Sequence, residues 1–474
     1  MASVGDKFSR IAALRPASPA SRPATLRAPD RDDFLCQLLG AAIATNRYGE
    51  HVSVRNWFSS PEFRVPAETT LHLLARSRDE LLSRRTQAAL ADPEKWLFLD
   101  TETTGLSGGT GTYAFLVGMA WLDAGGLQVE QLFLRDFAEE HSILYEVASR
   151  LTERPVLVTF NGKTFDWPLL ENRFTMTRAI AVPRLAAHLD LVHPARALWK
   201  FRLDSVRLVD LERYVLDPVR LGWHRDDDIA SSIIPSQYFD YLRGGPVEPL
   251  VAILRHNQMD LRGLAALFGK IDARLAPECQ DSDIHGLDLF GLARFLQRKG
   301  DAERAHSACE QALDHGLPLE FHGQARRDLA LLARRRGDHA KAASLWQELT
   351  TDEDEGIVAC EQLAIYYERR RKDFSRALEF AELAVSKLRR ARNRSHDALR
   401  SSRNLRLEQR FLNRVSRLKH RMNSSASLLT AISGRQGSAA DKRGDQKTRR
   451  DSVPAVLNFK EEIGWKPQRQ DRNL

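Results

Sequence analysis

Cysteine is scarce in this sequence of 474 residues. The four that occur lie far apart and never form a Cys-x-x-Cys pair; they are Cys36, Cys279, Cys309 and Cys360. This spacing argues against a disulfide framework and a cysteine metal site, and it predicts reduced thiols in a cytoplasmic protein. Long apolar runs are missing too, because no stretch approaches the roughly 20 apolar residues of a membrane-spanning helix. We therefore expect no membrane association.

A net positive charge is also missing, except towards the C-terminal end. Residues 389–474 contain 22 Lys and Arg against 8 Asp and Glu, whereas residues 1–388 contain 49 against 55. The net charge of +8 therefore comes from the last part of the chain. Such a region can neutralise the phosphates of a polyanion without reading its sequence. A solubilising, disordered extension is the alternative, and composition does not separate the two.

The length predicts two or three folded units, because domains typically contain about 100 to 200 residues. Composition and apolar patterning divide the chain into five segments. These are a disordered N-terminus at 1–30, a helical segment at 31–90, an α/β domain at 91–272, helical repeats at 286–422 and a basic, disordered tail at 423–474. Within the second segment we expect helices at 34–44 and 70–89.

Strand and helix patterns alternate in the α/β segment, which predicts a mixed sheet flanked by helices. The run Trp96-Leu-Phe-Leu-Asp100 is almost entirely apolar, as expected of a central strand buried on both faces. Apolar runs at 114–122 and 127–134 are separated by a turn-like Asp-Ala-Gly-Gly, so the first three strands should form an antiparallel meander. The remaining elements are helices at 139–151, 164–174 and 249–271 and a strand at 155–160.

A repeat of about 36 residues occupies the next segment. Its marks are Gly300-Asp301, Gly337-Asp338 and Lys372-Asp373, each followed four residues later by an alanine, namely Ala305, Ala342 and Ala377. The pattern predicts helix–turn–helix units with a small residue where two helices approach closely. It resembles the tetratricopeptide repeat (TPR), although the aromatic positions are only partly kept. A capping helix is expected at 405–422.

Acidic residues stand where the first strand ends, in Asp100-Thr-Glu-Thr-Thr104. Side chains alternate along a strand, so Asp100 and Glu102 project from the same face. Two carboxylates on one face of a buried strand repel each other unless a cation sits between them. A strand that simply ends in solvent with two acids is the alternative.

Two further candidates carry little weight when each is taken alone. Asp166 closes Asn161-Gly-Lys-Thr-Phe-Asp166 in the first turn of a helix, where an acid also serves as a capping residue. His256 and Asp260 are spaced four residues apart on the last helix and therefore share a face. By itself, that spacing is equally typical of an ordinary surface pair.

Taken together, these motifs resemble the DEDD superfamily of exonucleases, which have the ribonuclease H-like fold. The resemblance implies an α/β domain with this fold, followed by an all-α, TPR-like repeat domain. It assigns two divalent cations, Mg²⁺ or Mn²⁺, to the carboxylates of Asp100, Glu102, Asp166 and Asp260, and it makes His256 the base that activates water. One feature departs from the pattern, because the spacing from His256 to Asp260 is that of the tyrosine-type subgroup.

A larger set of motifs resembles the bacterial YprB-like branch of this superfamily, in which a nuclease-like domain is coupled to helical repeats. These motifs are Asp100-Thr-Glu-Thr-Thr-Gly-Leu-Ser-Gly-Gly-Thr-Gly-Thr112, Phe160-Asn-Gly-Lys-Thr-Phe-Asp-Trp-Pro-Leu-Leu170, His188-Leu-Asp-Leu191, Ile234-Pro-Ser-Gln-Tyr238 and His256-Asn257. The resemblance covers residues 90–272 well, the repeats loosely and neither tail.

Substrate contacts are expected on either side of the carboxylates. The glycine-rich run 105–112 lacks Gly-Lys-Ser/Thr, so it is not a Walker A loop and an ATPase is not expected. Its glycines would instead allow the backbone to approach the scissile strand. The substrate-binding candidates are Thr103, Gly108, Gly109, Asn161 and Lys163. Two other acidic sites, Asp190 and the run 226–228, are not among the four metal-binding carboxylates and are interpreted as structural.

The resemblance predicts a metal-dependent 3′–5′ exonuclease that acts on nucleic acid in nucleic-acid processing or DNA repair. Its repeats would recruit a protein partner, for example a helicase. Two alternatives stay open, a noncatalytic TPR-type scaffold built on a degenerate nuclease fold and an endonuclease on the same fold. The choice between DNA and RNA is also open.

Overall fold

The computed structural model describes residues 29–60, 62–63, 66–74, 84–105, 111–216, 221–277, 284–394 and 398–437. It divides the chain into two compact units, Met1–Ala359 and Cys360–Leu474. The disorder predicted for the N-terminus and for the end of the tail falls on residues 1–28 and 438–474, outside the described residues. Among the described helices, none is both long and apolar enough to cross a membrane.

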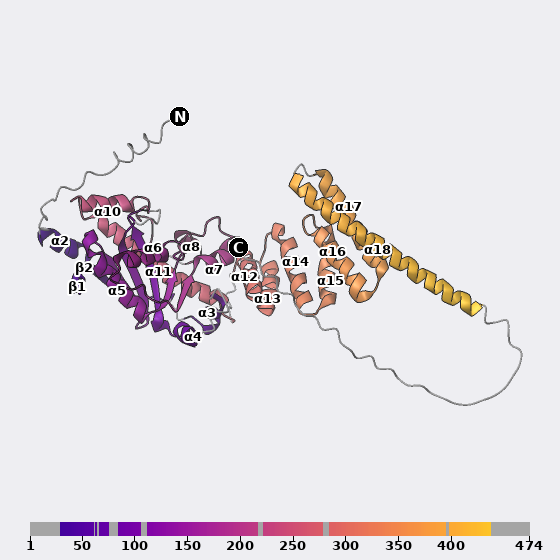
Figure 1. Ribbon diagram of the computed structural model, residues 1–474, viewed down its shortest axis with the longest axis horizontal. Helices are drawn as coiled ribbons and strands as arrows, with labels where there is room; N and C mark the ends of the chain where they lie inside the picture. Colours follow the sequence, from indigo (N-terminus) through magenta and orange to yellow (C-terminus); the bar gives the residue numbers. More distant parts are fainter. Residues whose placement is uncertain are drawn as a thin grey trace, which may run out of the picture. The chain divides into compact units, whose positions relative to one another are not determined.

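A seven-stranded mixed sheet forms the centre of the first unit, with the strand order β1-β2-β5-β4-β3-β6-β7 (Figure 1). The predicted meander is confirmed, because β3 pairs antiparallel with β4 and β4 pairs antiparallel with β5. On the other side of β3, β6 and β7 continue the sheet in parallel. The strands are β1 Ala42–Asn46, β2 Gly49–Phe58, β3 Trp96–Thr103, β4 Ala114–Asp123, β5 Gly126–Phe133, β6 Val156–Thr159 and β7 Ala187–Asp190.

The prediction of a wholly helical segment at 31–90 is wrong for its middle part. The segment begins with α2 (Pro29–Leu39), but residues 42–58 form the hairpin β1–β2, and β2 pairs with β5. Val52 and Val54 alternate with more exposed residues and are buried, which is the pattern of a strand covered on one face. Helices return only with α3 (Glu68–Leu74) and α4 (Arg84–Ala91).

Helices cover both faces of the sheet, as the alternation along β3 requires. Trp96 and Phe98 point to one face and pack against Phe268 of α11 (Pro249–Leu275). Leu97 and Leu99 point to the opposite face and join a separate core with residues of helices on that side. Those helices are α5 (Glu140–Glu153), α6 (Asp166–Thr177) and α10 (Ile234–Leu242). The fold is therefore the mixed sheet with flanking helices that the sequence predicts.

Two helical pairs follow in the same unit: α12 (Gly286–Lys299) with α13 (Ala302–Asp314), and α14 (Leu319–Arg335) with α15 (His339–Glu348). Each pair turns at a glycine with positive φ, 88° at Gly300 and 84° at Gly337. The aspartate that follows caps the second helix, since Asp301 accepts from the Arg304 N–H and Asp338 does so from that of Lys341. The predicted helix–turn–helix units are present at both positions.

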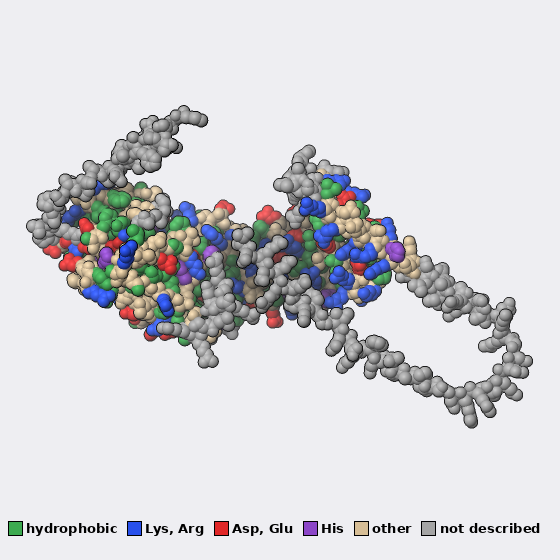
Figure 2. Space-filling view, in the orientation of Figure 1, with side chains coloured by type: hydrophobic (Ala, Val, Ile, Leu, Met, Phe, Trp, Pro, Cys, Tyr) green, Lys and Arg blue, Asp and Glu red, His purple; other side chains and the backbone are tan. Residues whose placement is uncertain are grey.

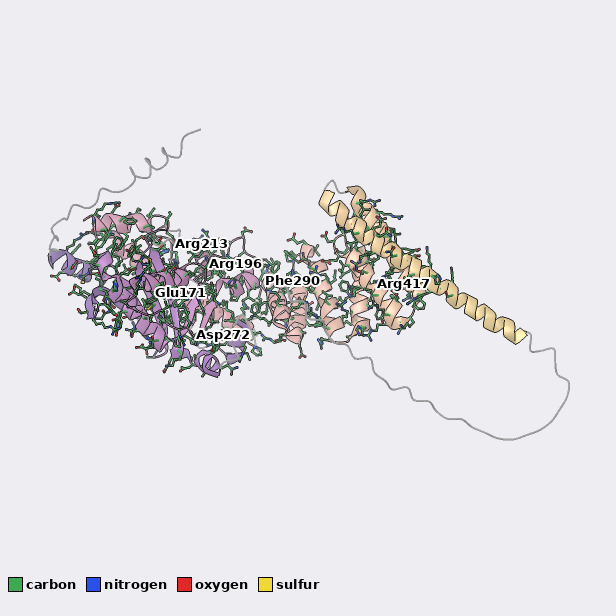
Figure 3. All side chains as sticks on the ribbon, viewed as in Figure 1. Glu171, Arg196, Arg213, Asp272, Phe290 and Arg417 are labelled. Carbon is green, nitrogen blue, oxygen red and sulfur yellow. The ribbon has the colours of Figure 1, made fainter. Side chains whose placement is uncertain are left out.

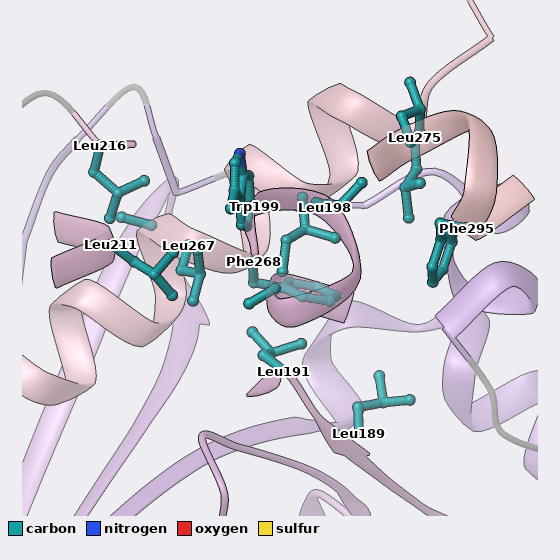
Figure 4. Close-up of a cluster of buried hydrophobic side chains, with 14 of the residues drawn as sticks. Leu189, Leu191, Leu198, Trp199, Leu211, Leu216, Leu267, Phe268, Leu275 and Phe295 are labelled. Carbon is teal, nitrogen blue, oxygen red and sulfur yellow. The ribbon is translucent and has the colours of Figure 1, made fainter. Parts of the chain in front are cut away.

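The first helical pair is packed directly on the α/β part of the unit. Gly291 of α12 lies so close to α7 (Val192–Trp199) that an added Cβ would be 2.2 Å from the carbonyl oxygen of Leu198. Phe290, labelled in Figure 3, packs against Phe201, with the ring centroids 5.1 Å apart and the ring planes tilted by 56°. Figure 4 shows the core at this junction, where side chains from the sheet, from α11 and from α12 come together. The α/β part and the first helical pair therefore share one hydrophobic core.

The second unit is helical. Its elements are the end of α16 (Gly356–Tyr366), the π-helical turn η4 (Tyr367–Arg371), α17 (Phe374–Arg394) and α18 (Ala398–Gly437). The third predicted turn has the same local form as the first two, with Lys372 at φ 57° and Asp373 accepting from the Arg376 N–H. The expectation of disorder from residue 423 is wrong as far as Gly437, because α18 continues to that residue.

Candidate metal centre

Strand β3 carries Asp100 and Glu102 beyond the point where its parallel neighbour ends. β6 pairs with β3 only along Trp96–Phe98, so the following residues of β3 are bordered by β4 alone. Asp100 and Glu102 share the face of Trp96 and Phe98, because side chains alternate along the strand. This is the face that α11 covers.

Helix α11 supplies the predicted His256 and Asp260, together with Asn257, to which the sequence motifs assign no role. The Asn257 Nδ2 donates to Oδ2 of Asp100 at 2.8 Å, and its Oδ1 accepts from Nε2 of Gln131 at 2.8 Å. Gly118, opposite Asp100 on β4, leaves the space for this amide, because an added Cβ would lie 2.2 Å from Oδ1 of Asn257. Asn257 therefore fixes the orientation of the Asp100 carboxylate.

Asp166 reaches the centre from the start of α6, as predicted. Its Oδ1 accepts from the Thr101 hydroxyl at 2.6 Å. The loop before it is held by Asp190, whose carboxylate accepts from the backbone N–H groups of Asn161 at 2.7 Å and Lys163 at 3.1 Å. Asp190 thus has the structural role that the sequence analysis gave it.

Three of the predicted residues lie within reach of a single ion. Glu102, His256 and Asp260 each offer one ligand atom, and these atoms lie within 4.8 Å of one another. The Nε2 atom of His256 is 3.8 Å from Oε1 of Glu102 and 3.5 Å from Oδ2 of Asp260. The spacing of four residues on α11 therefore does bring the imidazole to the carboxylates.

Behind His256 lies a group of charged residues that the motifs do not include. Asp228, interpreted above as structural, has its two carboxylate oxygens 2.8 and 2.9 Å from Nδ1 of His256. Because a carboxylate accepts hydrogen bonds, this contact places the imidazole hydrogen on Nδ1 and leaves the Nε2 lone pair facing Glu102 and Asp260. No local motif marks Asp228, because it comes from a loop and reaches His256 only through the fold.

Arg225 joins this group to the acids of the centre. Its guanidinium donates to Oδ1 of Asp260 at 2.5 Å, to Oδ2 of Asp228 at 2.9 Å and to both oxygens of Glu212 at 2.6 and 2.7 Å. Glu212 lies on α8 (Leu208–Tyr214) and fits against α11 at Gly263, where a Cβ would be 1.9 Å from Oε1. Arg225 thereby holds Asp260 and Asp228 at fixed positions beside His256.

The carboxyl groups of the acidic cluster, defined as Asp100, Glu102, Asp166 and Asp260, crowd one another. Burial, followed by repulsion from the rest of the cluster, raises the pKa of Asp100 well above its ordinary value. The same causes raise the pKa of Glu102 to about 8, and burial raises the pKa of Asp166. Within the described part of the chain, no Lys or Arg forms an ion pair with Asp100, Glu102 or Asp166, whereas Asp260 pairs with Arg225. The donor set, all oxygen apart from one imidazole nitrogen, fits hard divalent cations.

The predicted substrate-binding residues are only partly described. The Thr103 hydroxyl donates to the carbonyl of Gly105 at 2.9 Å, so it shapes the start of the glycine-rich loop. Gly108 and Gly109 lie outside the described residues. The backbone of Asn161 adopts φ 66°, and Lys163 lies close enough to His188 to lower the pKa of that imidazole. Contacts of these residues with a substrate stay a prediction.

Comparisons with known proteins relate the chain to two groups. Residues 97–271 match the model of the RNase_H superfamily. The chain is 30% identical over 309 residues to a protein described as "Uncharacterized protein YprB" from Bacillus subtilis (strain 168). The aligned region covers 64% of this chain and 72% of that protein. The crystal structure of BtubC (BKLC) from P. vanneervenii matches at a TM-score of 0.22 and 16% identity, over 57% of this chain and 97% of that one.

Proposed function

The chain belongs to the YprB family and contains an RNase_H superfamily domain at residues 97–271, and from that premise we propose that it is a metal-dependent nuclease. The observation that carries the proposal is the acidic cluster itself. Half-buried carboxylates from β3, α6 and α11 repel one another, and bound divalent cations would relieve this repulsion. A scaffold that only binds proteins has no use for this arrangement.

We assign two divalent cations, Mg²⁺ or Mn²⁺, to the acidic cluster. Glu102 and Asp260 would share one ion, because their carboxylates face each other beside His256. Asp100 and Asp166, which lie close enough to each other to raise the pKa of Asp100, would supply the remaining carboxylate ligands. Cations bound there would supply an activated water and stabilise the oxygen that leaves the phosphate. Asn257, Thr101 and Arg225 keep the carboxylates in position for this task.

His256 is proposed as the base. Its Nε2 faces the carboxylates of Glu102 and Asp260, where a reacting water would lie, and it can accept the proton of that water. Asp228 holds the imidazole through Nδ1 and would stabilise the cation that forms after proton transfer. The alternative role for Nε2 is direct metal ligation, which its distances also permit.

Within the nuclease class we propose 3′–5′ exonuclease activity in nucleic-acid processing or DNA repair, in the cytoplasm. The helical pairs α12–α15 and the second unit would act as a TPR-like module that recruits a protein partner such as a helicase. Support for the exonuclease type comes from the order and spacing of the acidic cluster along the chain. An endonuclease would use the same carboxylates and differ only in how the substrate end is recognised.

The test is hydrolysis of end-labelled linear and circular substrates, both DNA and RNA, by the full chain in Mg²⁺ or Mn²⁺. We expect stepwise shortening from the 3′ end and no cutting of circles. Asp100→Asn is the matched control and should abolish hydrolysis, lower Mn²⁺ binding in calorimetry and leave the metal-free protein at least as stable, because one charge of the cluster is gone. Absence of any hydrolysis by the wild type across several pH values would refute the proposal, and cut circles would replace exonuclease by endonuclease.

A further inference from the structure

The second unit exposes basic side chains far more often than acidic ones. Among its described side chains, two exposed residues are acidic, Glu379 and Glu382. Twelve exposed residues are basic, namely Arg369, Arg370, Arg371, Lys372, Arg376, Arg389, Arg390, Arg406, Arg410, Arg417, Lys419 and Arg421. Figure 2 shows Lys and Arg side chains gathered over the helices of this unit. The surface therefore carries a large excess of positive charge.

Two acids of this unit are buried and form ion pairs within it. Glu368 is 5% exposed and accepts from Arg417 at 2.9 Å, and Glu408 is 6% exposed and accepts from Arg389 at 2.7 Å and Arg392 at 2.9 Å. Each buried carboxylate thus ties α18 to a neighbouring helix and leaves part of the guanidinium outside. Arg410 likewise pairs with Glu361 at 2.9 Å, and Arg421 lies 3.7 Å from Glu368. The positive excess of the surface therefore comes from the number of exposed basic residues, which exceeds the number of acids available to pair with them.

The exposed arginines of α18 are arranged in a row. Arg406, Arg410, Arg417 and Arg421 are spaced i, i+4, i+11 and i+15, which places them within about 60° of one another around the helix. We call these four residues the arginine row. It runs for about 22 Å along α18, at about 1.5 Å per residue. Arg417, labelled in Figure 3, contacts Glu368 of η4, so the row lies beside the exposed arginines at the end of η4.

We propose that the arginine row, together with Arg369–Arg371 of η4 and the adjoining Lys372, binds the sugar–phosphate backbone of nucleic acid. The choice of this ligand rests on the proposed nuclease function, and the surface itself supplies the rest of the argument. Guanidinium groups that follow one another along a helix suit a ligand that carries negative charges along its length, and 22 Å corresponds to about six base-pair steps of a duplex. Guanidinium groups contact phosphate through paired hydrogen bonds without reading sequence.

The experiment measures binding of the metal-free full chain to fluorescent 30-nucleotide single-stranded and duplex DNA in EDTA, by anisotropy, at several salt concentrations. The triple variant Arg370→Gln, Arg371→Gln and Arg406→Gln removes three exposed charges for which the structure shows no acidic partner among the described residues. Each lost phosphate contact on duplex should lower the salt slope by about 0.9, so the slope should fall by about 2 to 3 units. Affinity should fall at least tenfold at low salt.

The matched control replaces three exposed arginines of the first unit that also show no acidic partner among the described residues, Arg184→Gln, Arg196→Gln and Arg335→Gln. It removes the same charge from a chain of the same length and should leave the salt slope unchanged. Equal losses in the two variants would overturn the proposal, because they would show a general charge effect. Binding of acidic lipid vesicles in place of nucleic acid would overturn it as well.

The proposed function and this surface fail in different ways. If the wild type binds DNA through the surface but hydrolyses no substrate, the nuclease proposal falls and the surface stands. If the triple variant binds 30-nucleotide DNA as tightly as the wild type and hydrolyses it at the same rate, the surface proposal falls and the nuclease stands. Measuring binding in EDTA keeps the two readouts separate, because no cleavage takes place.

Discussion

Asp228 is the residue whose contact adds most to the centre beyond the sequence motifs. It accepts from Nδ1 of His256 and is itself held by Arg225, so any effect on the proposed reaction would pass through the imidazole. Asp228→Ala should therefore lower kcat by about 10- to 100-fold while KM and Mn²⁺ binding change little. In ¹⁵N NMR spectra of the metal-free protein at alkaline pH, the His256 ring should lose its preference for hydrogen on Nδ1.

The neighbouring Asp227 provides the control for this prediction. It belongs to the same acidic run but is exposed. Asp227→Ala should keep both the activity and the ¹⁵N signature of the wild type. If Asp228→Ala lowers activity without changing the tautomer of His256, then Asp228 supports the fold of the loop and does not position the base.

His188 carries a prediction about stability and pH. Burial lowers its pKa to about 4, with a further contribution from the nearby Lys163 ammonium, whereas the ordinary value is 6.5. Between these two values the unfolded chain binds more protons than the folded chain, so the contribution of neutral His188 to stability is lost as the pH falls from 6.5 towards 4. The full shift corresponds to at most about 3 kcal/mol.

The measurement for His188 is urea unfolding of the wild type and His188→Gln between pH 7.5 and 4. The glutamine does not titrate, so the variant should lose less stability across this interval than the wild type. Above pH 7, where the imidazole is neutral in both the folded and the unfolded chain, the two curves should run parallel. Equal losses of stability at low pH would show that His188 does not titrate with the lowered pKa.

At the scale of elements, the sequence predicts the parts of the centre that depend on local pattern. The structure contains the predicted strand β3 with its two alternating acids and the predicted meander. It also contains the predicted helix α11, on which His256 and Asp260 share a face. The hairpin at residues 42–58 is not predicted, because β1 is a largely exposed edge strand and because β5, with which β2 pairs, is distant in the sequence. The close contact between Asn257 and Gly118 cannot be predicted from local pattern, because it forms only when α11 packs on β4.

Gly118 tests that relation between a strand and a helix. A Cβ at this position would meet the amide of Asn257, so Gly118→Ala should displace the side chain that orients Asp100. We expect a loss of about 1 to 3 kcal/mol in the free energy of unfolding, the usual cost of overpacking, and a fall in nuclease activity. Adding Asn257→Ala to Gly118→Ala should cost less than the sum of the single changes. Additive losses would mean that the two residues act independently.

At the scale of the whole molecule, the boundary expected between the α/β domain and the helical repeats is not a boundary in packing. The first helical pair shares a core with α7 and α11, and the first compact unit extends to Ala359. Sequence patterns mark where strands end and helical repeats begin, but they do not report which surfaces pack together. The close approach at Gly291 is such a contact, and a glycine inside a helix only hints at it.

The distribution of charge along the whole chain also looks different once the helices are known. Residues 389–437, which lie mainly in α17 and α18, contain 13 Lys and Arg against 2 Asp and Glu. Residues 438–474 contain 9 against 6. Most of the basic excess that the sequence analysis assigned to a tail therefore belongs to a mainly helical segment.

This distribution predicts the outcome of a truncation. A chain that ends at Gly437 loses a net charge of only +3 and keeps the arginine row, so the salt dependence of its binding to duplex DNA should remain within about 1 unit of the full-length slope. The triple variant Arg370→Gln, Arg371→Gln and Arg406→Gln should change that slope by more than the truncation does. Both proteins are compared with the full chain by anisotropy in EDTA, with circular dichroism to confirm equal helix content. If the truncation instead removes most of the salt dependence while the triple variant keeps it, the phosphates are bound by residues 438–474. The basic residues of that segment would then contact phosphate even though acidic residues lie among them.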